Sequence, residues 1–598
     1  MLEQTSKASL SMAGADRTIV LRRWLFAILV ISTSAALLWL LAVTLAPGGL
    51  GAVDFLILVS FAVTLPWTVI GFWNAAIGFW IMRFSADPAA AVLPAASRVR
   101  GDEPVTASTA ILLCIRNEQP DKVLRNIDFL LSSLLRSGAA SRFHLYVLSD
   151  TDEPKIAMAE DLQFTTLRDA WQGRVSVTYR RRISNVGFKA GNIRDFCDRW
   201  GSDHEFAVTL DADSAMSAEA VLRLVRIMQC SPRIGILQGL VVGLPSASAF
   251  ARIFQFGMRL GMQSFTLGSA WWQADCGPYW GHNAVLRLQP FIDHCALPLT
   301  ASGDPILSHD QIEAVLMRRG GYEVRVLPEE GLGWEENPPT LLEFIRRDLR
   351  WCQGNMQYGS FLTLPGLRNV SRFQLLFAML MFLNSLAWIS LLVLGSLLVA
   401  FADNPSTVIR ADAGAALLGA VFLLWFAPKT ATAADILMRA EARRAFGGGV
   451  RFCAGFIVEA IFSMLLLPIM WFSHTLFLLK ALFGGMIGWT AQSRDPHVVS
   501  WAAALRQLWP HTLMGAAIIA LLAVKSPSAL PYALLLAGGL ALSIPFAIVT
   551  SRPAVGRWLS RIGVGRLPEE TDAPHALGAL ALPVISLAIS RSAPEQCP

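Results

Sequence analysis

Long apolar runs lie near both ends of the chain, and a more polar region separates them. Residues 24–46 form a nearly unbroken apolar run, and about residues 53–82 form a second one after the uncharged link PGGLGA. The first run exceeds the core of a signal peptide, which holds about 7–15 apolar residues. Arg22, Arg23 and Arg83 lie on the outer flanks of the pair. We therefore expect a transmembrane hairpin whose two flanks face the cytoplasm.

The region from about residue 83 to residue 372 has a different pattern. Short apolar runs of strand character alternate there with helical stretches such as 121–136 and 217–229. The runs are 111–116, 143–149, 175–180, 206–210 and 234–241. Strands that alternate with helices predict an α/β domain with a mostly parallel sheet. Because it follows a hairpin with cytoplasmic flanks, we expect this domain to be cytoplasmic.

Apolar runs return after Arg372. Four of them fit one membrane span each: about residues 373–401, 413–438, 509–524 and 532–549. The stretch 452–487 is longer than the about 20 residues that one span needs. It fits two short helices that turn near Pro468, or an interfacial helix plus one span.

The positions of the arginines bear on the number of helices in 452–487 and on which parts of the chain are cytoplasmic. Four arginines follow the last apolar run, at Arg552, Arg557, Arg561 and Arg566, and predict a cytoplasmic tail. A cytoplasmic start and end require an even number of spans, which favours two helices in 452–487 and about eight spans. The expected parts are a cytoplasmic N-terminus (1–23), a transmembrane hairpin (24–82), a cytoplasmic α/β domain (83–372), a transmembrane region (373–550) and a cytoplasmic tail (551–598).

Composition agrees with this division. Apolar residues make up 54% of the 598 positions and charged residues 16%, which is typical of a membrane protein with a soluble domain. The net charge of +6 lies largely beside apolar segments, so we interpret it as membrane topology and expect no nucleic-acid partner. The eight cysteines include no CxxC pair, which argues against a zinc site or a disulfide framework.

Candidate chemistry begins in the stretch AVTLDADSAM. Asp211 and Asp213 follow an apolar strand, and Asp150 closes an earlier strand. Ligands of open α/β sheets bind beyond the carboxyl ends of the strands, and residues i and i+2 of a strand point to one side. The pair could therefore hold Mg²⁺ or Mn²⁺, which prefer oxygen ligands. Alternatively, Asp213 and Ser214 cap the helix near 217–229.

Further motifs carry a family resemblance. CIRNE (114–118), SDTDE (149–153), FKAGN (188–192) and RRDLRW (346–351), together with DAD, resemble a processive family 2 glycosyltransferase. Such enzymes have a GT-A fold between transmembrane helices and are similar to cellulose synthase. The longer stretches QADCGPYWGHNAVLR, LSHDQIEAVLMRRGGYEV and RRDLRWCQGN resemble the glucans biosynthesis glucosyltransferase H family, which makes the backbone of osmoregulated periplasmic glucans. The resemblance extends from about residue 20 to residue 550.

The resemblance implies roles at the donor side. The donor would be UDP-glucose, with Mg²⁺ or Mn²⁺ on Asp213 and with Asp211 near the sugar and phosphate. Asp150 would bind the uridine. Lys189 would lie near the nucleotide, or its ammonium pairs with a structural carboxylate. The residues of the first nucleotide-contacting stretch would be Asn117 and Glu118.

The resemblance also implies the base and the leaving-group contacts. Asp310 stands at the position of the catalytic base, and His309 could orient it. Asp310 could equally cap the helix that follows it. A single displacement would invert the anomeric centre and give a β linkage. Arg350 would clamp the diphosphate, whereas Arg347 departs from the QxxRW signature.

The acceptor side is expected around Trp351, whose flat face suits a pyranose ring. The alternative is a core or membrane-interface tryptophan. Gly281 and His282 suggest a loop of close approach to the acceptor, with His282 as a hydrogen-bonding group. WEENPP (334–339) is interpreted as a solvated loop.

Three further segments have alternatives. Residues 249–265, with Arg252 and Arg259, predict an amphipathic helix on the membrane surface or a core helix. GWTAQSRD (488–495) stands where related synthases carry a gating loop, and Arg494 could reach a diphosphate. Glu459 and His474 could line a path for the glucan or lie near an interface.

These inferences predict a multi-pass enzyme of the bacterial inner membrane that transfers glucose to a growing glucan and moves it across the bilayer. The β-1,2 linkage is implied by the resemblance alone. Expected partners are UDP-glucose, a glucan acceptor, the lipid bilayer and possible acyl carrier or periplasmic glucan-modifying proteins. The alternatives are another polysaccharide synthase, making cellulose or chitin, and a catalytically silent transporter or scaffold.

Overall fold

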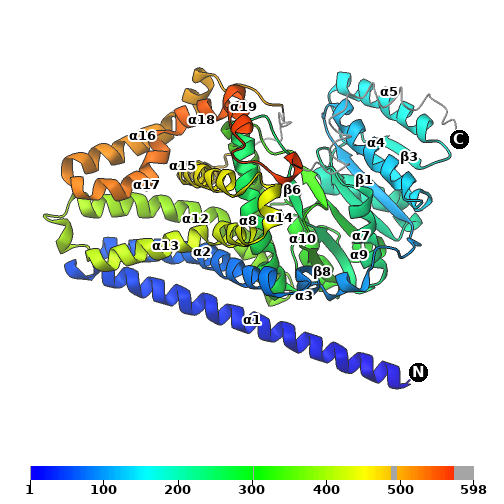
Figure 1. Ribbon diagram of the computed structural model, residues 1–598, viewed down its shortest axis with the longest axis horizontal. Helices are drawn as coiled ribbons and strands as arrows, with labels where there is room; N and C mark the ends of the chain where they lie inside the picture. The colour runs from blue at the N-terminus through cyan, green and yellow to red at the C-terminus, as the bar shows by residue number, and fades with distance from the viewer. Residues whose placement is uncertain (1, 301, 487–494, 572–598) are drawn as a thin grey trace.

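The computed structural model describes residues 2–300, 302–486 and 495–571. A bundle of long apolar helices occupies one half of the molecule, and an α/β domain occupies the other half (Figure 1). The α/β domain contains the stretch that lies between the first two long helices and the later ones, as the alternation of apolar and polar runs predicted.

The centre of the α/β domain is a mixed sheet of seven strands in the order β3-β2-β1-β4-β7-β5-β8. All neighbouring pairs are parallel except those of β7, which is antiparallel to β4 and β5. The strands are β1 (Thr109–Ile115), β2 (Phe143–Ser149), β3 (Ser176–Arg181), β4 (Phe206–Asp211), β5 (Ile234–Gly239), β7 (Ala284–Arg287) and β8 (Glu323–Leu327). This GT-A-like sheet confirms the predicted fold class.

Helices cover both faces of the sheet, which explains why central strands such as β1 are apolar on both sides. Ile111 and Leu113 of β1 pack into a core on one face, and Leu112 between them packs into a core on the other. The covering helices are α4 (Pro120–Arg136), α5 (Pro154–Trp171), α6 (Phe188–Trp200), α7 (Ala218–Gln229), α9 (Leu288–His294) and α10 (Asp310–Arg319). A second, two-stranded sheet joins β6 (Val241–Gly243) to β9 (Gly333–Glu335).

Six helices of the described residues are long and apolar enough to cross a membrane. They are α1 (Leu2–Leu45), α2 (Ala52–Phe84), α12 (Asn369–Ala400), α13 (Ala411–Met438), α15 (Gly449–Ala481) and α16 (Trp501–Lys525). A seventh candidate is the pair α17 (Leu530–Ala541) and α18 (Ser543–Ser551), which bends by 57°. The expected count of eight spans is not reached in the described part of the chain.

The difference arises in the stretch 452–487. Residues 449–481 form one continuous helix, α15, so the prediction of two helices that turn near Pro468 is wrong. A proline inside an apolar helix removes one backbone hydrogen bond, and neighbouring helices tolerate this without a chain reversal. Figure 1 looks almost along α15, whereas α12, α13, α16 and α17 lie across the view. α15 therefore crosses the bundle at a steep angle to its neighbours.

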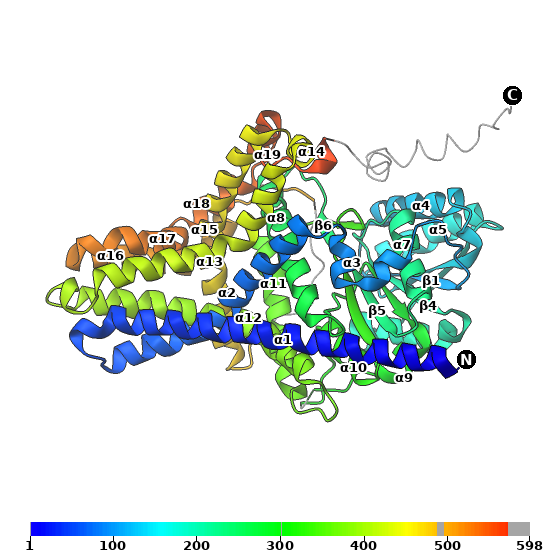
Figure 2. The ribbon, with the colours of Figure 1, turned by 60° about the horizontal axis from the view of Figure 1, so that its bottom comes forward.

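Helix α8 (Ala249–Gln273) and helix α11 (Leu341–Met356) lie between the bundle and the sheet (Figure 2). The arginines of α8 are buried: Arg252 pairs with Glu570 at 2.7 Å, and Arg259 pairs with Glu569 at 2.8 Å. The prediction that α8 lies on the membrane surface is wrong for this reason, because its arginines bind carboxylates inside the protein.

The backbones of α2 and α8 touch where glycines face each other's chain. A Cβ added at Gly78 would lie 1.8 Å from the carbonyl oxygen of Ser264, and one at Gly268 would lie 1.9 Å from that of Asn74. The indole of Trp272 also donates to the side-chain oxygen of Asn74 at 3.0 Å. The first hairpin is thus packed directly onto the helix that borders the α/β domain.

This packing predicts that Gly78→Ala lowers the stability of the protein by at least about 1–3 kcal/mol, because the added methyl group forces α2 and α8 apart. Gly71→Ala in the same helix is the matched control, since a Cβ at Gly71 would meet nothing within 4 Å. Thermal unfolding of the two purified variants in detergent measures the difference. Equal midpoints for both variants would contradict this account of the contact.

Candidate functional site

Three predicted positions lie together at the carboxyl edge of the sheet. β1 pairs with β2 and β4 in parallel, and the register aligns Cys114 with Asp211 and Ile115 with Ser149. The segments that follow these strands carry Asn117, Asp150 and Asp211, so these residues lie at one edge, where ligands of α/β sheets bind.

Asp150 is buried and already paired. It is 4% exposed, and its two carboxylate oxygens accept from Nε and Nη2 of Arg182 at 2.7 and 2.6 Å. Arg182 also donates to the carbonyl of Phe188 at 2.9 Å and thereby holds the FKAGN segment. Sequence reasoning missed Arg182, because it lies just beyond β3 outside any motif. Uridine binding by Asp150 stays a prediction.

Asn117 connects the ends of β1 and β2. Its φ of 55° is a conformation that asparagine tolerates better than most residues. Its side-chain oxygen accepts from the backbone N–H groups of Asp152 and Glu153 at 3.2 and 3.1 Å. Glu118, the next residue, is partly buried. Their contact with a nucleotide also stays a prediction.

The DAD motif forms a turn. β4 ends at Asp211, whose N–H donates to Oγ of Ser214 at 3.0 Å, so strand alternation does not extend to Asp213. The side chain that caps α7 is Ser217, which accepts from the N–H of Ala220. The alternative in which Asp213 and Ser214 cap this helix is therefore wrong.

Lys189 joins this turn to residues 276–283, which we call the acceptor loop after the role predicted for it. Its ammonium binds the carboxylate of Asp211 and donates to the carbonyl of Gly281 at 2.8 Å. Burial alone would lower the pKa of Lys189, but the Asp211 carboxylate raises it overall. The contact agrees with the interpretation in which the Lys189 ammonium pairs with a carboxylate, here that of Asp211 in DAD. Proximity of Lys189 to a nucleotide stays a prediction.

The residues at this edge fit a metal that arrives with its substrate. Among the described residues, no group of three or more His, Cys, Asp and Glu side chains could hold a metal ion. Asp211 and Asp213 supply at most two carboxylates, and Lys189 neutralises part of that charge. Mg²⁺ commonly binds through one or two carboxylates and takes its remaining ligands from phosphates and water, so the donor set suits a metal–diphosphate complex.

A cavity of about 830 Å³ opens beside this edge. Seven of the predicted site residues line it: Lys189, Gly281, His282, His309, Asp310, Arg350 and Trp351. Its lining also includes residues of the long apolar helices, Trp67 of α2 and Phe377 of α12, and Met262 of α8. Glu459 and His474 do not line it. The cavity therefore continues from the catalytic domain toward the bundle.

Asp310 is the first residue of α10. The N-cap position is His309, and no side chain makes a capping hydrogen bond there. A Cβ at Gly281, whose φ is 81°, would lie 3.5 Å from Cβ of Asp310. The positive φ favours glycine at this position of the loop, which lies next to the candidate base.

His309 has a partner other than Asp310. Its Nδ1 lies 2.9 Å from Oε2 of Glu313, one turn along α10. Burial alone would lower the pKa of His309, but the Glu313 carboxylate raises it overall. These contacts do not include a hydrogen bond from His309 to Asp310. The prediction that His309 orients Asp310 therefore stays a prediction.

Trp351 is 48% exposed and lines the cavity, so it is not a core residue. The guanidinium of Arg347 lies 4.6 Å from the centre of its ring, and this stacking supports one face of the indole. Burial, together with Arg346 and Arg347, lowers the pKa of Arg350. Asp348 of the same helix binds Nε2 of His474 in α15 at 2.6 Å, which ties α11 to the bundle.

Glu335 was missed, because WEENPP was interpreted as a solvated loop. The segment includes β9, Trp334 is buried, and Glu335 lines the cavity with its carboxylate 3.6 Å from Nε2 of His282. The indole of Trp334 donates to Glu569 at 3.2 Å, so the C-terminal segment holds this strand in place. The adjacent Trp334 was the one sequence signal for burial.

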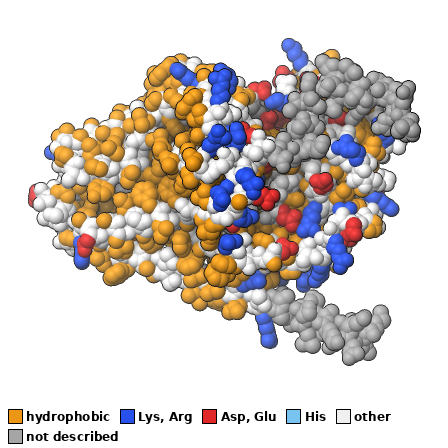
Figure 3. All heavy atoms as spheres, in the orientation of Figure 1, with side chains coloured by type: hydrophobic (Ala, Val, Ile, Leu, Met, Phe, Trp, Pro, Cys, Tyr) orange, Lys and Arg blue, Asp and Glu red, His pale blue; other side chains and the backbone are white. Residues whose placement is uncertain are grey.

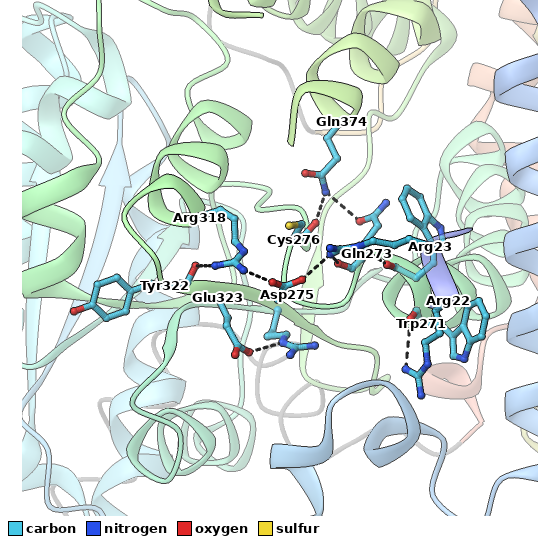
Figure 4. A network of polar contacts seen from close by, with 12 residues as sticks. Arg22, Arg23, Trp271, Gln273, Asp275, Cys276, Arg318, Tyr322, Glu323 and Gln374 are labelled. Atoms are coloured by element: carbon cyan, nitrogen blue, oxygen red, sulfur yellow. Dashed lines mark hydrogen bonds and ion pairs between the residues drawn. The ribbon is translucent and has the colours of Figure 1, made fainter. Parts of the chain in front are cut away.

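The acceptor loop begins at a buried charge cluster. Arg23 of α1 and Arg318 of α10 reach Asp275 from opposite sides (Figure 4). Gln374 at the start of α12 donates to the carbonyl of Cys276. Burial alone would raise the pKa of Asp275, but Arg318 and Arg23 lower it overall. Arg23 thus has a specific protein contact in addition to its place beside the membrane.

One predicted contact lies outside the described residues. Arg494 and most of the candidate gating loop fall within 487–494, and only Asp495 at its end is described.

Comparison with known proteins defines the class. The model of the family described as "Glycosyl transferase family group 2" matches residues 206–429. The chain therefore carries a family 2 glycosyltransferase domain, which contains DAD, the acceptor loop, Asp310 and Trp351.

Longer relatives extend this match. The chain is 35% identical over 547 residues to "Glucans biosynthesis glucosyltransferase H" of Pseudomonas paraeruginosa, which covers 88% of this chain and 63% of the relative. It is 33% identical over 577 residues to the protein of the same name from Ralstonia nicotianae, covering 94% of this chain and 66% of the relative. The chain is a relative of these glucosyltransferases H, which confirms the resemblance, and it spans less than two thirds of their length.

A solved mannosyltransferase from Pyrobaculum calidifontis, in complex with GDP-Man and Mn²⁺, matches with 14% identity and a TM-score of 0.37. The match covers 61% of this chain and 98% of the other. A similarity of this size says nothing about the ligands of this chain.

The cluster at Asp275 predicts that Asp275→Asn destabilises the protein by about 3–5 kcal/mol, because the buried Arg318 and the partly buried Arg23 lose their counter-charge. Asp293→Asn is the control, since this exposed carboxylate lies on α9, outside the cluster. Thermal unfolding in detergent compares the two variants. A stable Asp275→Asn protein would show that the cluster is dispensable.

The raised pKa of His309 predicts a pH dependence. A raised folded pKa stabilises the protein fully below the unfolded value near 6.5, and this stability is lost as the pH rises through the folded pKa. The stability gap between wild type and Glu313→Gln should be largest below pH 6.5 and should narrow at alkaline pH. In a His309→Gln background the gap should not change with pH. If the stability difference between wild type and Glu313→Gln did not change with pH, the pH dependence could not come from the His309–Glu313 pair.

Proposed function

We propose that this protein transfers glucose from UDP-glucose to a growing β-glucan, with inversion at the anomeric carbon. The observation that carries the proposal is the cavity into which Asp310, Arg350 and Trp351 open together. A candidate base, a cation for the leaving group and an aromatic platform are the parts that such a transfer requires.

The donor would bind at the carboxyl edge of the sheet. Asp213 and Asp211 would hold Mg²⁺ or Mn²⁺ with the diphosphate, and the metal would stabilise the negative charge on the leaving UDP. Lys189 holds Asp211 next to Gly281, so the anomeric carbon would lie between DAD and the acceptor loop. Arg350 adds a cation at the cavity side of this point.

The chemical step is a single displacement. The acceptor hydroxyl oxygen attacks the anomeric carbon, its proton passes to the Asp310 carboxylate, and the bond from that carbon to the diphosphate oxygen breaks. UDP leaves from the opposite face, so an α-linked donor gives a β-linked product. Gly281 leaves room for the acceptor beside Asp310.

The cavity lining suits a sugar chain. Trp351 offers a flat apolar face, and amide side chains around it can bond hydroxyl groups. These amides are Gln273, Gln311, Gln353, Asn355, Gln357 and Gln374. Part of the lining belongs to membrane helices, which supports movement of the glucan into the bundle and across the bacterial inner membrane, with the catalytic domain in the cytoplasm.

The names of the relatives support a glucan product. The osmoregulated periplasmic type and the β-1,2 backbone are part of the proposal and come from the family resemblance. Because the chain spans about 63% of the first of these relatives, its full activity and any acyl carrier or periplasmic glucan-modifying partner belong to this proposal. Linkage analysis of the product distinguishes it from a cellulose or chitin synthase.

The test is transfer of labelled glucose from UDP-glucose by the membrane-reconstituted protein with Mg²⁺. Asp310→Asn should lower transfer by about 10²–10⁴-fold, because the base is lost, while UDP affinity stays within about twofold. Asp304→Asn is the matched control, since this exposed carboxylate lines the same cavity.

Full transfer by Asp310→Asn would contradict the role of the base. If the wild-type protein neither transfers glucose nor binds UDP, the catalytically silent transporter or scaffold is the better explanation.

A further inference from the structure

Two arginine-rich segments lie apart in the sequence and remain outside the transfer reaction. One leads from α13 through α14 (Ala440–Ala445) into α15, and the other contains α19 (Pro553–Ile562). Their arginines are Arg439, Arg443, Arg444, Arg451, Arg552, Arg557, Arg561 and Arg566. Glu441 is the one acidic residue within 439–451, and there is none within 552–566.

The two segments meet at a group of glycines. A Cβ at Gly563 would lie 2.9 Å from Cδ of Arg451 and 3.8 Å from Nη2 of Arg566. A Cβ at Gly447 would lie 3.1 Å from Cδ of Arg566, and one at Gly449 would lie 3.8 Å from Cδ of Arg443. Three arginines from separate turns therefore gather around backbone that has no side chains of its own.

The charges of these three arginines are not compensated within the described residues. Arg443, Arg451 and Arg566 form no ion pair there, whereas Arg439 pairs with Asp435. The nearby carboxylates of the C-terminal segment, Glu569 and Glu570, are bound by Arg259 and Arg252 of α8. Three guanidinium groups held together without an acid are a favourable place for an anion, and their forked donors match phosphate oxygens.

The position of this group is at the edge of the apolar half. Figure 3 shows blue side chains gathered where the orange surface of the helical bundle meets the catalytic domain, over the region of α14 and α19 in Figure 1. Large apolar side chains are exposed beside the arginines: Val450 is 87% exposed and Trp558 is 58% exposed. Tryptophan is enriched at the level of lipid headgroups, and exposed apolar groups suit acyl chains.

We propose that Arg443, Arg451 and Arg566 form a binding site for the phosphate headgroup of an anionic phospholipid. Basic clusters next to membrane helices attract anionic lipids. One or two contacts between arginine and a lipid headgroup raise the affinity for that lipid by about one order of magnitude. Arg252 donates to the carbonyl of Val564 at 3.1 Å, two residues before Arg566. The lipid site is therefore connected to α8, whose side chains line the cavity.

The test measures lipid binding to the full-length protein by native mass spectrometry from detergent micelles, with phosphatidylglycerol and phosphatidylcholine as probes. Wild type should bind phosphatidylglycerol at least about tenfold more tightly than phosphatidylcholine. The variant R443Q/R451Q/R566Q should lose this selectivity to within about twofold.

The control is R136Q/R142Q/R174Q, which removes the same charge from exposed positions of the α/β domain. It should keep the wild-type selectivity, and all three proteins should have similar thermal midpoints. The proposal is overturned if the first variant keeps its selectivity, or if the control loses as much, which would indicate a general effect of net charge. Equal thermal stabilisation of the wild type by inorganic phosphate and by phosphatidylglycerol would indicate a free-phosphate site and would also overturn it.

Discussion

Ion pairs and a hydrogen bond fix the acceptor loop, residues 276–283, near both of its ends, and the arrangement of the site depends on this constraint. At one end Asp275 lies between Arg23 and Arg318, and at the other the carbonyl of Gly281 accepts from Lys189, which also binds Asp211. The loop is thereby held between the DAD turn and the start of α10. Asp310 and Trp351 line one cavity together with Gly281 and His282 of this loop.

The same contacts make the bundle part of the site. Arg23 comes from α1, Gln374 comes from α12, and α8 packs backbone to backbone against α2. His474 binds Asp348 and so attaches α15 to the helix that carries Trp351. A catalytic domain inserted between membrane helices is therefore joined to them by specific polar pairs, and its cavity has walls from both parts.

Sequence patterns predicted those features that are local. Apolar runs predicted β1 to β5, and the carboxylates that follow them predicted the edge at which Asp150 and Asp211 lie. Partners set by tertiary contacts were not visible: Arg182 follows β3 without a motif, and the half-buried Glu335 lies in a polar stretch whose strand β9 pairs with β6. Apolar length left two readings open for the α15 stretch, and the even number of spans expected from the flanking arginines favoured two helices. The structure has one continuous helix there, because a proline inside an apolar helix does not require a chain reversal.

In the proposed reaction, the acceptor glucan lies in the cavity that Trp351 and residues of the membrane helices line. The most direct test is photo-crosslinking of a glucan oligosaccharide that carries a diazirine at the end remote from the accepting hydroxyl, with the labelled residues identified by mass spectrometry. Crosslinks to Trp67, Phe377 and Met381, lost in the presence of excess unlabelled glucan, are the predicted result. Crosslinks confined to the outer helices α4 and α5 of the α/β domain would contradict the account.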